Sequence, residues 1–118
     1  MSILHVVFCI ALQAAFSQLS VRGTWDFDIQ WLNGDRRTAV FVLQQDGEKL
    51  TGTYTGGLGS SKVSGTLKES FFELRFQTRE GPFRVWGTMQ ASESKLRGQI
   101  DFPRGKGIFT ANKRSVPK

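Results

Sequence analysis

The stretch LTGTY (residues 50–54) has four close variants elsewhere in the chain. All five have apolar residues at both ends and a glycine in the middle; the others are VRGTW (21–25), VSGTL (63–67), VWGTM (85–89) and LRGQI (96–100). Apolar and polar residues that alternate with a period of two are typical of β-strands with one buried face. The repeated phrase therefore predicts a protein built from strands.

The same alternation continues along most of the chain after residue 18. It predicts eight strands, at residues 25–31, 37–45, 49–55, 61–67, 71–78, 83–91, 95–102 and 106–112. The connections between them are short and rich in Gly, Asn, Asp, Ser and Pro, which are turn-forming residues. No segment has the pattern of an amphipathic helix, so we expect an all-β domain that extends over residues 18–118.

Short connections make neighbours in sequence neighbours in space, which predicts an antiparallel meander. Eight such strands in a flat sheet would leave one apolar face and two unpaired edges, and closing the sheet removes both problems. We therefore expect an eight-stranded antiparallel up-and-down barrel. A two-sheet sandwich or a partly open barrel is the alternative.

The turns also predict a register for four of the hairpins. A three-residue loop at Asn33-Gly34-Asp35 and two-residue turns at Asp46-Gly47, Glu80-Gly81 and Pro103-Arg104 keep the apolar residues of all strands on one side. The expected cross-strand pairs are Phe27–Phe41, Phe41–Gly52, Phe76–Val85 and Gly98–Phe109. The inward glycines, Gly52, Gly65, Gly87, Gly98 and Gly107, are expected to allow strand coiling and to leave space beneath cross-strand aromatics.

The first residues have the pattern of a secretory signal peptide. Residues 3–16 are mostly apolar but too few for a membrane span, and Ala15 and Ser17 are small residues at the −3 and −1 positions of a cleavage site. We expect a signal peptide at 1–17 and a secreted or periplasmic protein; the alternative is an N-terminal strand or helix packed on the domain. Cleavage would remove Cys9 and His5, the sole cysteine and histidine of the chain.

A mature chain without these two residues has no imidazole base, no thiol nucleophile and no His or Cys metal ligand. The closest pair of carboxylates, Asp26 and Asp28, lies on the outward face of the first strand, where both are expected to be solvated. We therefore expect no enzyme, no catalytic residue, no cofactor and no metal site.

Ligand binding is the function that the pattern favours, because an eight-stranded barrel can hold one small ligand at its open end. The expected site is an apolar pocket lined by Trp25, Phe27, Trp31, Tyr54, Phe76 and Phe83. The alternative is an interaction patch on the outer face, formed by Phe71, Arg75 and Trp86, with Arg75 directly opposite Trp86 as a cation–π pair. That patch would bind a protein, a carbohydrate or a second copy of the chain.

The formal net charge of +6 favours an anionic partner such as a polysaccharide. Secretion argues against nucleic acid as the partner. The sequence leaves the oligomeric state open.

Two family resemblances follow from these motifs. GTWDFDI (23–29) and LTGTYTGG (50–57) resemble avidin-type barrels, and Tyr54 matches their biotin-contacting tyrosine. Phe27, Trp31 and Gly107 stand where that family has polar contacts to biotin. The resemblance therefore implies an avidin- or lipocalin-like barrel without biotin binding.

The second resemblance covers nearly the whole mature chain. The repeated Leu-x-Gly-Thr phrase, and above all QDGEKLTGT (45–53), is similar to a class of small secreted bacterial domains that occur alone or attached to hydrolases. This resemblance implies a non-catalytic accessory barrel.

The signal peptide can be tested by expressing the full chain in a bacterial host that exports it. We expect the exported protein to begin at Gln18, because signal peptidases require small residues at −3 and −1. Intact-mass measurement reads the new N-terminus, and Ala15→Phe should abolish the cleavage. An exported protein that retains residues 1–17 would contradict the prediction.

Overall fold

The computed structural model describes residues 20–90 and 94–115, so the predicted signal peptide (1–17) lies outside the described residues. No helix in these two ranges is long and apolar enough to cross a membrane. The described residues form eight β-strands: β1 (Gly23–Trp31), β2 (Arg36–Asp46), β3 (Lys49–Gly56), β4 (Gly59–Lys68), β5 (Phe71–Thr78), β6 (Gly81–Met89), β7 (Lys95–Phe102) and β8 (Gly105–Lys113).

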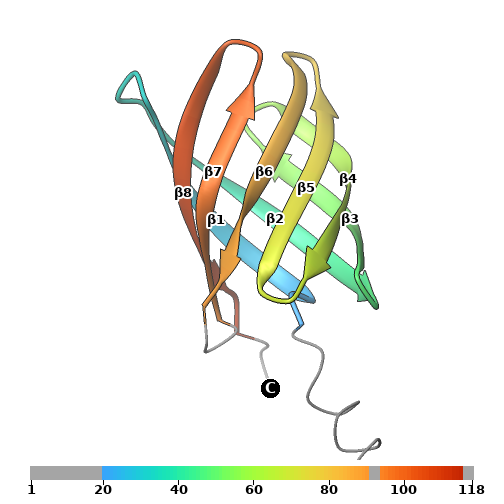
Figure 1. The fold of residues 1–118 in the computed structure, drawn as a ribbon. Coiled ribbons are helices and arrows are strands. Elements are labelled where there is room, and N and C mark those ends of the chain that lie inside the picture. Colours follow the sequence, from blue (N-terminus) through green and yellow to red (C-terminus); the bar gives the residue numbers. More distant parts are fainter. Residues whose placement is uncertain (1–19, 91–93, 116–118) are drawn as a thin grey trace, which may run out of the picture.

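Each strand pairs antiparallel with the next one in sequence, and β1 also pairs with β8 (Figure 1). This last pairing closes the sheet, so the predicted eight-stranded up-and-down barrel is confirmed and the sandwich and partly open alternatives are excluded. The described chain starts and finishes at the lower end of the barrel in Figure 1. We call the opposite end, formed by the β1–β2, β3–β4, β5–β6 and β7–β8 connections, the mouth.

The predicted register is correct for one of the four hairpins and shifted in the other three. Gly98 lies opposite Phe109, as expected. Phe27 lies opposite Ala39 instead of Phe41, Phe41 opposite Tyr54 instead of Gly52, and Phe76 opposite Phe83 instead of Val85. Each of these shifts is two residues, which leaves every side chain on its predicted face because the side-chain period of a strand is also two.

Local turn chemistry explains two of the three shifts. The β2–β3 turn consists of Gly47-Glu48, with Gly47 in the left-handed region (φ 64°) that the first position of a type II′ turn requires. The β5–β6 turn consists of Arg79-Glu80 because the Thr78 hydroxyl accepts from the Glu80 N–H (3.0 Å) and donates to the Gly81 carbonyl (3.2 Å).

The interior is filled with apolar side chains, and no polar or charged residue is buried among the described residues. At the closed end, the fully buried Trp25 donates its indole N–H to the Val21 carbonyl (2.8 Å). The Val21 N–H donates in turn to the Gln45 side chain (2.9 Å). The residues before β1 therefore cover this end of the core.

The inward glycines let neighbouring backbones approach each other closely. A Cβ at Gly52, Gly65, Gly87 or Gly98 would overlap a carbonyl oxygen of the adjacent strand. Gly87 and Gly98 face each other across β6 and β7, and a Cβ on Gly98 would lie 2.6 Å from the Gly87 Cα. The predicted role in strand coiling fits this geometry. The predicted space beneath an aromatic ring is found at Gly107, where a Cβ would lie 3.0 Å from Trp31 Cε3, whereas at the other four glycines the nearest atoms are backbone.

Gly98→Ala should lower the free energy of unfolding by about 1–3 kcal/mol, the usual cost of overpacking, because its methyl group can fit only if β6 and β7 separate. Gly57→Ala is the matched control, since a Cβ there meets no atom within 4 Å. Urea unfolding of both variants measures the difference. Equal stabilities for the two variants would show that close backbone approach does not constrain the barrel.

Candidate functional site

The mouth contains an open depression of about 700 Å³. Its walls come from the β1–β2 hairpin, the β3–β4 turn and the mouth ends of β5, β6 and β7. The hairpin of β1 and β2 extends outward at the upper left of Figure 1.

A row of stacked aromatic rings forms one side of this depression. Tyr54, Phe76, Phe83 and Phe102 follow one another with ring centroids 4.6, 5.1 and 4.7 Å apart and interplanar angles of 21°, 18° and 10°. Trp31 meets Phe83 and Phe102 edge-on, at 6.3 and 5.1 Å. We call these five residues the aromatic row. They lie together because each is an inward residue near the mouth end of its strand.

Buried side chains close the floor of the depression. Phe41 packs edge-on against Phe76 (5.5 Å), and below it Phe27 contacts both Phe41 (4.3 Å) and Phe109 (4.7 Å). Phe27, Phe41 and Phe109 are almost completely inaccessible to solvent. A ligand can therefore occupy the mouth but cannot pass into the barrel without displacing the core.

The residues that line the mouth include three basic and two acidic side chains. Arg37 lies 3.8 Å from Asp35, and Arg104 lies 3.4 Å from Glu80. Lys106 makes no ion pair within the described part of the chain. The lining therefore carries a small excess of positive charge.

The structure brings together four of the six residues predicted to bind a ligand. Trp31, Tyr54, Phe76 and Phe83 line the mouth. Trp25 lies at the closed end and Phe27 in the middle of the core, so neither reaches the depression. We leave both out of the candidate site.

Arg37 and Phe102 also line the mouth, although neither was predicted from the sequence. Both lie on the inward face of their strands, because residues two positions apart share a face: Arg37 precedes the inward Ala39 by two residues, and Phe102 follows the inward Ile100 by two. Extending the alternation to the strand ends would have found them.

The carboxylates weighed for catalysis lie on the outer face, each beside an arginine. Asp28 pairs with Arg36 (3.3 Å). Asp26 accepts two hydrogen bonds from Arg114, which lower the pKa of that carboxyl. Among residues 20–90 and 94–115, no three His, Cys, Asp or Glu side chains gather in a way that could hold a metal ion.

On the outer face, the predicted pairing of Arg75 with Trp86 is wrong. The two-residue register shift places Glu73 opposite Trp86 and Arg84 opposite Arg75. The Arg84 guanidinium lies over the Trp86 ring at 4.3 Å, and Phe71, the third residue of the predicted patch, is 48% exposed. The cation–π pair thus exists, with a different arginine.

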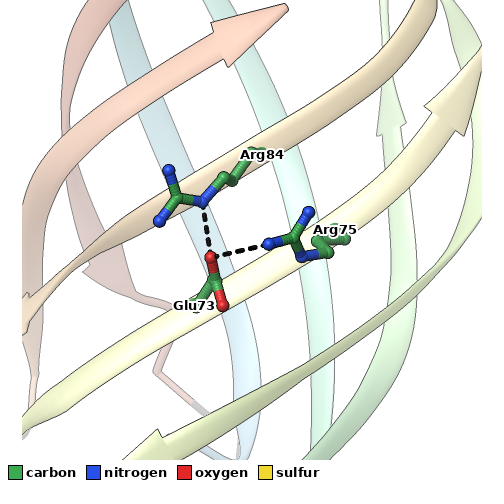
Figure 2. Close-up of polar contacts among 3 residues, drawn as sticks. All are labelled: Glu73, Arg75 and Arg84. Atoms are coloured by element: carbon green, nitrogen blue, oxygen red, sulfur yellow. Dashed lines mark hydrogen bonds and ion pairs between the residues drawn. The ribbon is translucent and has the colours of Figure 1, made fainter.

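Glu73 joins the two arginines, as Figure 2 shows. It accepts from Arg84 Nε at 2.5 Å and from Arg75 Nη2 at 3.2 Å. The Arg84 hydrogen bond, and then the nearby positive charges, hold the pKa of the Glu73 carboxyl below its ordinary value of 4.5. Glu73 therefore remains ionised under mildly acidic conditions.

Comparison with solved structures defines the class of protein. The chain is similar to a redesigned β-barrel, b11L5F_LGL, with a TM-score of 0.64 and 15% identity over 81% of this chain and 92% of that one. It is similar to the redesigned barrel mFAP1 bound to DFHBI (TM-score 0.63, 13% identity, 80% and 94% covered). It is also similar to a de novo designed fluorescence-activating β-barrel (TM-score 0.60, 18% identity, 80% and 93% covered).

At these identities the similarity establishes the fold alone: the protein is an eight-stranded antiparallel β-barrel. No family model and no curated protein matches the sequence. The resemblances to avidin-type barrels and to secreted bacterial Leu-x-Gly-Thr domains therefore rest on the quoted motifs.

Glu73→Gln should lower the free energy of unfolding at neutral pH by about 1 kcal/mol or less, as expected for a partly exposed ion pair. Because the folded-state pKa of Glu73 is depressed, its contribution is present above the ordinary pKa and is lost as pH falls through the folded-state value. The variant and the wild type should therefore converge in strongly acidic buffer.

Urea unfolding at neutral and acidic pH measures this convergence. Glu48→Gln is the control, because Glu48 lies in the β2–β3 turn and makes no ion pair within the described residues. A constant difference between Glu73→Gln and wild type at every pH would rule out the ion-pair network as its source.

Proposed function

We propose that the protein is a secreted, non-catalytic β-barrel that binds a small apolar ligand in its mouth. The observation that carries this proposal is the aromatic row, which lines an open depression above a filled core. Aromatic rings in the interior of a protein normally pack on all sides, whereas the half-buried Trp31 and Phe102 have packing partners on the core side and the depression on the other.

Size and chemistry support a small ligand. Ligand pockets typically occupy about 300–1,000 Å³, are lined mainly by apolar and aromatic side chains, and contain a few polar groups that fix the orientation. The mouth fits this description, with aromatic rings on one side and charged side chains around the rim. Transfer of an apolar ligand from water to the aromatic row would supply the driving force, at about 25 cal/mol per Å² of apolar surface buried.

The designed barrels give independent support. The mFAP1 barrel, whose fold matches this chain with a TM-score of 0.63, is bound to the small molecule DFHBI. A barrel of this shape is therefore able to hold a small ligand, and we extend that capacity to the present chain.

The outer face offers less to a partner than the sequence suggested. Arg84 covers the Trp86 ring, and Glu73 neutralises part of the charge of Arg75 and Arg84. Phe71 is left as an exposed aromatic beside this network. We therefore place the binding function in the mouth.

Titration with N-phenylnaphthylamine, a neutral dye that fluoresces when it leaves water, tests the proposal. We expect saturable binding to the wild type and at least tenfold weaker binding to Leu58→Glu, a change of about 1.4 kcal/mol. Leu58 lies in the β3–β4 turn and lines the mouth, so the introduced carboxylate would need to be desolvated beside the dye.

Phe71→Glu is the matched control, because it introduces the same charge on the outer face. It should bind the dye like the wild type. Loss of binding in Phe71→Glu with retention in Leu58→Glu would move the function to the outer face, and absence of saturable binding to the wild type would overturn the proposal.

A further inference from the structure

We infer that the ligand is a planar aromatic acid whose carboxylate binds to Arg37, an inference that rests on the proposed function of the mouth. It follows from three features of the depression: the position of Arg37, the hydrogen-bond donors beside the aromatic row, and the near-parallel orientation of the rings.

Arg37 is the one basic residue of β2 on the inward face. It lies opposite Ile29 and precedes the buried Ala39 by two positions, so its side chain enters the mouth. Its guanidinium donates one hydrogen bond, from Nη1 to the Arg36 carbonyl (3.1 Å). A guanidinium has five N–H donors, so most of its capacity remains for a ligand.

The nearest acid does not occupy this capacity. Asp35 Oδ2 lies 3.8 Å from Arg37 Nη2, beyond hydrogen-bond distance, and the two side chains are 56% and 64% exposed. Such an exposed pair is weak. A ligand carboxylate that accepts two parallel N–H bonds from the guanidinium would form the stronger contact.

Two further donors lie in the aromatic row itself. Neither the Trp31 indole N–H nor the Tyr54 hydroxyl makes a hydrogen bond to the described residues, and neither is buried without a partner. Trp25 at the closed end, by contrast, has its indole N–H bonded to Val21. Both groups can donate a hydrogen bond to a ligand that brings acceptors.

The rings of the row favour a flat ligand. From Tyr54 to Phe102, successive rings are inclined by only 10–21° and stack face to face, so their aligned edges are left for a ligand. A planar aromatic body can lay its face across these edges, the edge-to-face arrangement that aromatic pairs favour. The Tyr54 hydroxyl keeps its place because Gly56 has no side chain: a Cβ there would lie 2.5 Å from the phenolic oxygen.

The charges around the mouth agree with an anion. Glu80 is already paired with Arg104 at 3.4 Å. Lys106 lies at the rim of the mouth on the outward side of β8, opposite Asp101, and makes no ion pair within the described residues. Arg37 is therefore the cation that is left to face a ligand.

Displacement of bound N-phenylnaphthylamine by naphthoate and by its neutral amide, naphthamide, tests the inference, because the two compounds share one ring system. For the wild type we expect naphthoate to bind about tenfold more tightly than naphthamide. Arg37→Gln should remove this preference, because it should weaken naphthoate binding about tenfold more than naphthamide binding. Arg36→Gln, which removes the same charge from the adjacent outward position, should retain it.

The outcomes separate the two proposals. If the dye binds but both competitors displace it equally, or if Arg36→Gln and Arg37→Gln behave alike, the inference about the acid is overturned and the mouth remains a site for apolar ligands. If the wild type does not bind the dye, both proposals fail. A stronger effect of a naphthylmethylammonium ion than of naphthoate would also overturn the inference, because it would show that Asp35 and Glu80 govern the mouth.

Discussion

Closure of β1 on β8 is the constraint on which the other features of this protein depend. An eight-stranded barrel is narrow, so its strands must coil strongly and its backbones come into contact where they bend. Four glycines occupy such contacts, and at each one a side chain would overlap the carbonyl oxygen of the neighbouring strand. The glycine of LTGTY is therefore a requirement of closure. Because the barrel is narrow, the apolar residues on the inward face are enough to fill it.

The face of every strand could be predicted from the sequence, but the register of most hairpins could not. A single residue decides where a turn forms: the Thr78 hydroxyl fixes Arg79-Glu80 in place of the expected Glu80-Gly81. Such a choice depends on one or two local hydrogen bonds, which composition does not reveal. A turn displaced by one residue shifts the register by two, so the core survives the error and the cross-strand pairs do not. The mistaken pairing of Arg75 with Trp86 has this origin.

The candidate site was predictable to the same degree. The alternation of side chains along each strand correctly identified Trp31, Tyr54, Phe76 and Phe83 as inward residues. Alternation does not, however, indicate how far along the barrel axis a residue lies. Trp25 and Phe27 are inward residues as well and are buried away from the mouth. Arg37 also lies on the inward face, but a charged residue at the end of a strand is not expected to be inward from its type alone. The position of an inward residue along the barrel axis can be predicted only when each turn and strand end has been assigned to one end of the barrel.

The two ends of the barrel differ in how they satisfy their polar groups, and this difference supports the mouth as the location of the proposed site. At the closed end, the indole N–H of Trp25 donates to the Val21 carbonyl, and the backbone N–H of Val21 donates to the Gln45 side chain. These polar groups are therefore satisfied within the protein. At the mouth, the indole N–H of Trp31 has no such partner within the described residues, although the same type of side chain lies in the same strand. A protein that needed only a stable core could have covered both ends alike. The open end combines stacked rings with hydrogen-bond donors that no described residue uses, and this combination is what favours the mouth as the proposed site.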